Sequence, residues 1–163
     1  MNLKTRKKNR LVNFDYSRNG AYFITICTKN RVEYLSIIEN HSFVKLTNYG
    51  IVVEETIQNT GRFYNSVYID KYVIMPNHIH MIIRIENDIN ERPMVAPTIS
   101  NIINQMKGYI SKKIGFSIWQ KSFHDHIIRN EKEYAALWNY IEYNPCTWEN
   151  DCLYVKTNST TYL

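Results

Sequence analysis

Apolar and polar residues alternate along several stretches of the chain, which is the pattern of strands that bury one face. In GAYFITICTKN, near the start of the chain, Tyr22, Ile24 and Ile26 fall on one side of the predicted strand. Further extended segments are predicted in HSFVKLT, SVYIDKYVIM, HIHMIIRI and IWQKSFHDHIIR. Pro76 and Asn77 interrupt the run between SVYIDKYVIM and HIHMIIRI, so we expect two separate strands there.

Three other stretches repeat apolar residues at helical spacing. We expect one helix at about 49–63, and a second helix that Thr98 caps and Gly115 ends. The third predicted helix covers residues 131–144. Its start and end are marked by capping and helix-ending residues: Asn130, Glu133 and Pro145.

The predicted order of elements is β, β, α, β, β, α, β, α. This order indicates an α+β fold, in which an antiparallel β-sheet has helices packed mainly on one face. A length of 163 residues suits one domain with its own core. We expect a basic N-terminal arm over residues 1–19, a single domain over 20–153 and a frayed C-terminal tail over 154–163.

The composition, with 44% hydrophobic and 21% charged residues, is ordinary for a soluble globular protein, and we expect a cytoplasmic one from the cysteine count. No apolar run approaches the roughly 18 residues that a membrane-spanning helix needs, so we expect no membrane association. The opening MNLKTRKKNR has no apolar stretch after it, and we therefore expect no secretory signal. Three cysteines without a CxxC pair fit a reducing compartment: Cys27, Cys146 and Cys152.

Positive charge is concentrated in two stretches of the chain. The first ten residues contain five basic residues and no acid, and these equal the whole net charge of +5. The segment from 92 to 124 also contains no Asp or Glu, and its basic residues are Arg92, Lys107, Lys112, Lys113 and Lys121. A basic arm and a basic patch on a neutral body favour a polyanionic partner. The alternative is a solvated tail and a solvated helix face.

The run VIMPNHIHMIIRI places His78 and His80 one residue apart in an apolar segment. Alternate residues of a strand face the same side, so both imidazoles share one side with Ile82 and Arg84. The opposite side is fully apolar and is expected to pack on helices. Two imidazoles roughly 7 Å apart at Cα can converge on one metal ion. The alternative is that they fill a polar corner of the core.

A second pair of this kind, His124 and His126, reduces the specificity of the pattern. Asp125 points to the opposite side of an extended chain, which argues against a three-ligand cluster from this segment. Basic residues flank the pair, and no long apolar strand accompanies it. We interpret this second pair as structural or substrate-facing.

The last predicted helix offers further polar groups near its buried face. The apolar stripe of the helix is formed by Tyr134, Leu137, Trp138 and Ile141. At about 100° per residue, Tyr140 lies roughly 110° and Asn144 roughly 70° from the centre of this stripe. The two residues are four apart and stack on one flank of the helix. The alternative is a boundary tyrosine that packs its ring, followed by a C-terminal asparagine.

Three motifs in order, PNHIHMII, WQKSFHDHIIRNEKEY and YIEYNP, resemble the single-tyrosine HUH transposases, and most closely the REP-associated tyrosine transposases. The likeness extends from about Gly20 to Pro145. It implies the ferredoxin-like HUH endonuclease fold and a transposase that cleaves and rejoins single-stranded DNA hairpins. Relatives act as homodimers or, in the REP-associated branch, as monomers, and either state fits this chain.

The resemblance also implies roles for individual residues. His78 and His80 would bind a divalent cation, Mg²⁺ or Mn²⁺, and Tyr140 would be the nucleophile that forms a 5′-phosphotyrosine intermediate. Insertion-sequence relatives have a metal-binding Gln four residues after the nucleophile. This chain has Asn144 there, one methylene shorter.

Basic residues are expected to pair with DNA phosphates, and the candidates are Lys107, Lys112, Lys113, Lys121 and Arg129. Three other functions stay open at this point. A non-catalytic nucleic-acid binder would not need Tyr140. A zinc hydrolase would use the same histidine pair with a nearby carboxylate, for which Glu86 and Asp70 are the nearest candidates in sequence. A purely structural protein would bind no divalent ion.

Overall fold

The computed structural model describes residues 18–87 and 97–155. Within these residues, the strands (β), α-helices (α) and short 3-10 helices (η) follow the order β1 (Gly20–Cys27), η1 (Lys29–Arg31), β2 (Ser36–Glu39), β3 (Phe43–Leu46), α1 (Asn48–Phe63), β4 (Val67–Ile74), β5 (His78–Ile85), α2 (Ile99–Ile114), β6 (His124–Ile128), α3 (Glu131–Tyr143) and η2 (Pro145–Asn150). The predicted basic arm and most of the predicted tail lie outside the described residues, as does Arg92. The division into arm, domain and tail therefore stays a prediction.

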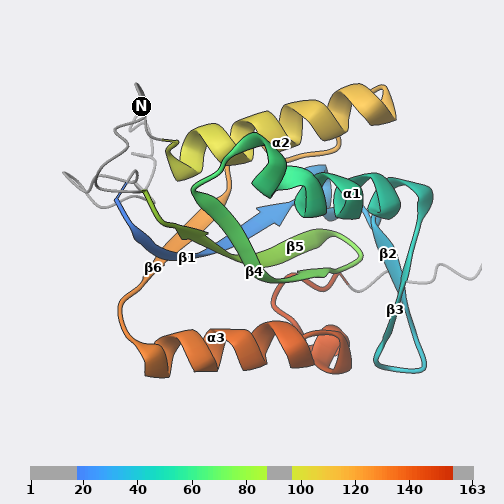
Figure 1. Ribbon diagram of the computed structural model, residues 1–163. Helices are drawn as coiled ribbons and strands as arrows, with labels where there is room; N and C mark the ends of the chain where they lie inside the picture. The colour runs from blue at the N-terminus through green and yellow to red at the C-terminus, as the bar shows by residue number, and fades with distance from the viewer. Residues whose placement is uncertain (1–17, 88–96, 156–163) are drawn as a thin grey trace, which may run out of the picture.

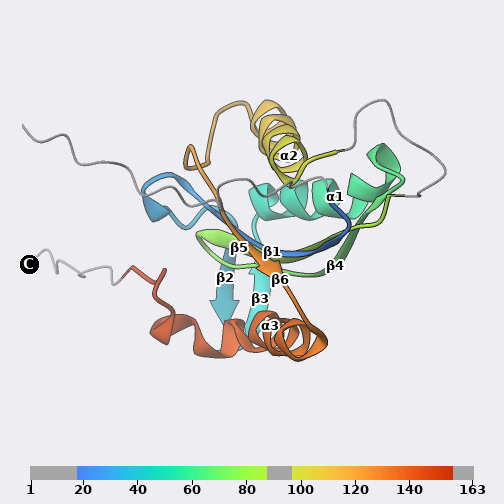
Figure 2. The ribbon, with the colours of Figure 1, turned by 90° about the vertical axis from the view of Figure 1, so that its left-hand side faces the viewer.

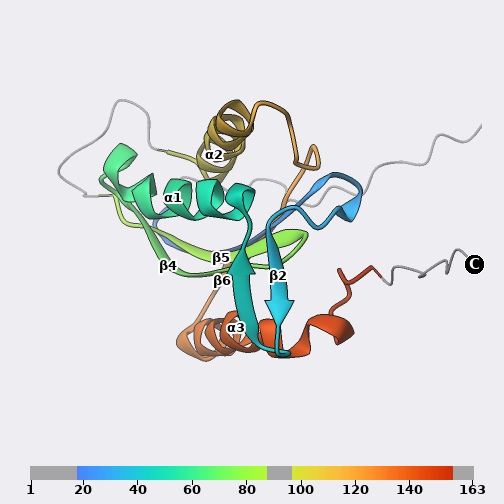
Figure 3. The ribbon, with the colours of Figure 1, turned by 90° about the vertical axis from the view of Figure 1, so that its right-hand side faces the viewer.

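In the described part of the chain, four strands form the main sheet in the order β4-β5-β1-β6, and each neighbouring pair is antiparallel. Thr25 of β1 lies opposite His80 of β5 and opposite His124 of β6. Strands β2 and β3 form a separate antiparallel hairpin. Figure 3 shows this hairpin running past the edge of the sheet towards the end of α3.

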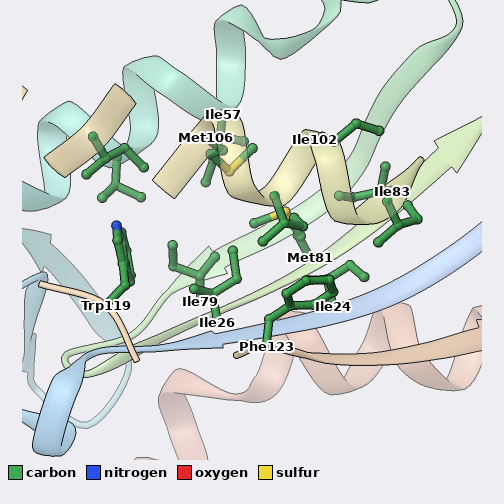
Figure 4. Close-up of a cluster of buried hydrophobic side chains, with 14 of the residues drawn as sticks. Ile24, Ile26, Ile57, Ile79, Met81, Ile83, Ile102, Met106, Trp119 and Phe123 are labelled. Atoms are coloured by element: carbon green, nitrogen blue, oxygen red, sulfur yellow. The ribbon is translucent and has the colours of Figure 1, made fainter. Parts of the chain in front are cut away.

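Helices cover both faces of the main sheet (Figures 1 and 2). Helices α1 and α2 pack on one face, and α3 lies on the other. The larger core lies between the sheet and the α1–α2 layer, and Figure 4 shows its tightly grouped apolar side chains, including Ile24, Ile26, Ile79, Met81 and Ile83. The predicted α+β fold, with an antiparallel sheet and helices mainly on one face, is confirmed.

The helix ends agree with the sequence signals. The Thr98 hydroxyl accepts a hydrogen bond from the backbone N–H of Asn101, and α2 ends at Gly115 with φ of 95°. This left-handed conformation has little steric cost for glycine. The Asn130 side chain accepts a hydrogen bond from the Glu133 N–H at the start of α3. None of the helices in the described residues is long and apolar enough to cross a membrane.

Two features differ from the sequence prediction. Strand β2 was not predicted, because its four residues, SIIE, are too short to show a clear alternation. The apolar stripe of α3 is also less buried than its spacing suggests. Within this fully described helix, Ile141 alone is buried, whereas Trp138 is 36% exposed.

Candidate active site

His78 and His80 begin strand β5, directly after a tight turn. The two-residue turn Pro76-Asn77 joins β4 to β5, and it is closed by the hydrogen bond from Met75 N to His78 O. Proline fixes the backbone conformation of such a turn, and asparagine tolerates it well. Both imidazoles face α3 rather than the α1–α2 core. The side chains are 0% and 3% exposed, and their ring centroids are 4.5 Å apart.

Hydrogen bonds orient both imidazole rings. His78 Nδ1 lies 2.8 Å from the side-chain oxygen of Asn77, whose amide nitrogen donates to the Leu153 carbonyl at 2.9 Å. Since the Asn77 oxygen can only accept, the proton of His78 belongs on Nδ1, and Nε2 keeps its lone pair. His80 Nδ1 is hydrogen-bonded to the Thr25 hydroxyl at 2.8 Å. His78 Nε2 is therefore available as a ligand, and His80 Nε2 faces α3.

Tyr140 reaches these rings from α3. Its hydroxyl lies 3.4 Å from His80 Nε2, and the two ring centroids are 5.2 Å apart. Phe23 of β1 packs edge-on against the Tyr140 ring and stacks on the His80 ring. Tyr140 is 42% exposed, so its phenol remains open to solvent on one side. The structure thus brings together the tyrosine and the histidine pair that the sequence singled out.

Asn144 follows the last turn of α3 and is 1% exposed. Its amide nitrogen donates to Asp151 Oδ2 at 3.0 Å. Among the described residues, no hydrogen-bond partner exists for its buried side-chain oxygen or for the buried Nε2 of His78. Buried polar atoms are nearly always paired in proteins, so two unpaired atoms at one place indicate a site built for a ligand.

Sequence reasoning missed Asp151. The six-residue η2 turn brings the chain back towards β5. One ligand atom each of His78, His80 and Asp151 then lies within 4.8 Å of the others, and this group could hold a metal ion. The only sequence signal was an acid shortly after the helix-ending proline, which is too common to be informative. Asp70, a carboxylate near the histidines in sequence, is instead paired with Arg84.

Burial sets the electrostatics of this cluster. Burial, followed by repulsion from His80, lowers the pKa of His78 to about 3. Burial likewise lowers the pKa of His80 to about 4. Both imidazoles are therefore neutral at neutral pH, as metal ligation requires. Burial, and then the charge of Asp151, raises the pKa of Tyr140 to about 12.

Asp151 keeps its negative charge in the same surroundings. Burial by itself raises the pKa of this carboxyl group. The hydrogen bonds from the Leu153 N–H and from the Asn144 amide outweigh that effect, and the pKa of Asp151 is lowered overall. The cluster therefore combines two neutral imidazoles, a neutral amide and one carboxylate.

No protein-family model matches the chain. An uncharacterized protein of Haemophilus influenzae is 34% identical, and the match covers 92% of this chain and 93% of that protein. A second protein of that organism, provisionally named a REP-associated tyrosine transposase, is 28% identical over 80% of this chain and 73% of its own length. A solved structure of a REP-associated tyrosine transposase bound to a REP hairpin superposes with a TM-score of 0.64. It is 23% identical and covers 85% of this chain and 74% of its own. The chain is therefore similar in sequence to a protein that bears the name of the REP-associated tyrosine transposases, and similar in fold to a solved one.

The second histidine pair does not belong to the cluster of His78, His80 and Asp151. His124 and His126 are exposed on the edge strand β6, on the sheet face that carries His80. His126 Nε2 is 2.6 Å from a carboxylate oxygen of Glu133, which ties β6 to the start of α3. Asp125 lies opposite Ile24 of β1, on the other face, as predicted.

The predicted phosphate-binding residues are spread over different parts of the fold. Lys112 and Lys113 are exposed on α2, across the sheet from α3, and Lys121 and Arg129 are exposed on either side of β6. Lys107 differs from the expectation, because it is 8% exposed and its ammonium group donates to the carbonyls of Gln120 and Lys121. Helical spacing alone does not show that the Lys107 side chain points inwards and donates to the segment between α2 and β6.

Proposed function

We propose that this protein is a metal-dependent transposase that cleaves and rejoins single-stranded DNA at hairpin-forming repeats. In this proposal Tyr140 is the nucleophile, and His78, His80 and Asn144 hold Mg²⁺ or Mn²⁺. The supporting observation is that the Tyr140 hydroxyl lies 3.4 Å from His80 Nε2, in a cluster that also contains two unpaired buried atoms, His78 Nε2 and Asn144 Oδ1. Similarity to a transposase solved with a REP hairpin supports hairpin DNA as the substrate.

The residues present fit a divalent cation. Leaving a buried polar atom without a partner costs about 1–3 kcal/mol, and a bound ion would remove that cost for both atoms. Two imidazole nitrogens and an amide oxygen leave positions for water and phosphate oxygens, which Mg²⁺ and Mn²⁺ favour. When bound, the ion would polarise the scissile phosphate and stabilise the negative charge that develops during cleavage.

Tyr140 would form the covalent link to DNA. Its oxygen attacks the phosphorus, the bond from phosphorus to the 3′-oxygen breaks, and a 5′-phosphotyrosine results. The phenol proton passes to solvent, and the released 3′-oxygen takes up a proton. Because the ester linkage is retained, attack by another 3′-hydroxyl rejoins a strand without a separate energy source. Phe23 orients the phenol ring, and the exposed side of Tyr140 leaves room for a strand.

The remaining parts of the proposal concern binding and assembly. Lys112, Lys113, Lys121 and Arg129 are exposed and would neutralise DNA phosphates, with help from the basic arm over residues 1–19. Lys107 is buried, so we do not expect it to contact DNA phosphates. Tyr140 and His80 approach each other within a single chain, so we expect the domain over 20–153 to act in cis, as a monomer.

A denaturing gel tests the nucleophile directly. Labelled single-stranded hairpin DNA is incubated with the protein and Mn²⁺, and we expect a labelled band at the mass of the protein. Tyr140→Phe should abolish this band. Tyr143→Phe is a matched control, since Tyr143 lies on the same helix, is 62% exposed and has no ring contact with the histidines in the described structure. Adduct formation that survives Tyr140→Phe would refute the assignment of the nucleophile.

One observation favours a second function. A carboxylate beside two histidines is also a common zinc-binding set, and zinc hydrolases use water as the nucleophile. The same gel separates the two functions. Cleaved DNA without a protein-linked band would indicate hydrolysis, whereas binding without cleavage would indicate a non-catalytic relative.

A further inference from the structure

Asp151 lies beyond the helix that carries the proposed nucleophile. Pro145 ends that helix, and η2 then turns the chain back so that Asp151 meets the two histidines. This return is braced at several points. Leu153 N donates to Asp151 Oδ1 at 2.6 Å, and the Leu153 carbonyl accepts from the Asn77 amide at 2.9 Å. The segment is thus attached to the residue that orients His78.

The positive charge of a bound divalent ion would also need an acidic side chain to balance it. His78, His80 and Asn144 are neutral donors, so they would leave the two positive charges of a divalent ion uncompensated in a buried site. Charges buried without compensation are costly. One carboxylate and one scissile phosphodiester together supply two negative charges. Asp151 is the carboxylate that the structure places beside both histidines, and it would make the loaded site neutral when DNA is bound.

The carboxylate of Asp151 has free coordination capacity. Each of its oxygens accepts one hydrogen bond, from Leu153 N and from the Asn144 amide. A carboxylate offers about four lone-pair positions, so about two remain. Ligand atoms around a common small cation are roughly 3–4 Å apart, and the histidine and aspartate donors already lie within 4.8 Å of one another. The spacing of these three groups is therefore close to that of ligands around one ion.

We infer that Asp151 is the anionic protein ligand of the cation site and that it also orients the oxygen of Asn144 towards the ion. This inference rests on the proposed function, because it completes the same site. It also gives a reason why Asn144 can serve where relatives of the insertion-sequence type have the longer glutamine. The amide of Asn144 is positioned by Asp151, and the carboxylate provides an additional oxygen ligand.

Mn²⁺ binding tests the inference without reference to activity. Free Mn²⁺ is titrated by electron paramagnetic resonance against the full chain, its Asp151→Asn variant and a Glu149→Gln control. Glu149 is an exposed acid two residues away that lies outside the cluster. We expect Asp151→Asn to weaken binding by at least about 10-fold, and Glu149→Gln to leave it unchanged. His78→Ala should also weaken binding and serves as a reference for loss of a ligand.

A second measurement uses the unmodified chain and does not depend on how the variant folds. With ¹³C-labelled aspartate, electron–nuclear double resonance of bound Mn²⁺ should show coupling to a carboxylate carbon. Equal affinity of the Asp151→Asn variant, or no carboxylate coupling, would overturn the inference. If Mn²⁺ binds with that coupling but no Tyr140 adduct forms, the proposed function fails while the site stands. If the adduct forms but Asp151 proves irrelevant to binding, this inference alone fails.

Discussion

Replacing Lys107 with methionine tests whether this lysine supports the fold or contacts DNA. Its ammonium group donates to the backbone carbonyls of Gln120 and Lys121, and the side chain is 8% exposed. Those carbonyls belong to the segment that leads from α2 into β6. Methionine retains most of the aliphatic volume but leaves both carbonyls without this donor.

The expected cost follows from these contacts. A hydrogen bond to a charged group contributes about 1.5–3 kcal/mol. Part of this is offset because burial of the ammonium is unfavourable, as shown by the lowered pKa of Lys107, whose main cause is desolvation. We therefore expect Lys107→Met to reduce the free energy of unfolding by about 1–3 kcal/mol. The salt dependence of DNA binding should stay the same, since the ammonium contacts no phosphate in this arrangement.

Lys112→Met is the matched control, because Lys112 is exposed about 1.4 turns further along the same helix. We expect it to change stability by no more than about 0.5 kcal/mol. If Lys112 contacts a phosphate, the slope of log affinity against log salt should fall by about 0.7–0.9. Urea unfolding and fluorescence anisotropy with labelled hairpin DNA measure the two effects. A Lys107→Met variant of unchanged stability but reduced salt slope would refute the reasoning.

Two further predictions concern close packing at a glycine and the histidine pair that binds Mn²⁺. A Cβ at Gly50 would lie 2.0 Å from the Leu35 carbonyl oxygen, whereas one at Gly108 meets nothing within 4 Å. Gly50→Ala should therefore destabilise the fold by about 1–3 kcal/mol or more, whereas Gly108→Ala should stabilise it by up to about 1 kcal/mol. Equal urea midpoints for the two variants would contradict this expectation. His80→Ala should weaken Mn²⁺ binding by at least about 10-fold, while His124→Ala should not; the reverse ranking in a titration would show that the wrong histidine pair was chosen.

Local periodicity accounts for the part of the fold that could be predicted. The alternation in β1 and β5 follows from the division of each strand into two faces, and the caps at Thr98 and Asn130 satisfy helix ends. Periodicity identifies the apolar face of an element but not what covers it. For this reason the stripe of α3 was expected to be buried, although it packs over the mixed face of the sheet and leaves Trp138 partly exposed.

The residues of the candidate site also divide into those that a sequence pattern reveals and those that it does not. His78 and His80 are recognisable because strand geometry places them on one side, and Tyr140 and Asn144 because helix geometry stacks them. Asp151 enters the site through an irregular turn, which has no repeating pattern to reveal it. Lys107 shows the converse case. Its place in a basic stretch of sequence suggests DNA contact, but in the fold its ammonium group donates to the backbone carbonyl of Gln120.

The position of the proposed nucleophile depends on both ends of α3. Few side chains of this helix are buried, so its packing alone holds Tyr140 weakly. Near its start, the Tyr134 hydroxyl donates to Asp70 on β4 at 2.8 Å. At its end, Asn144 donates to Asp151, within the candidate cation site itself. Binding a cation there would fix the end of the helix four residues from Tyr140, so the group that activates the phosphate would also position the phenol that attacks it.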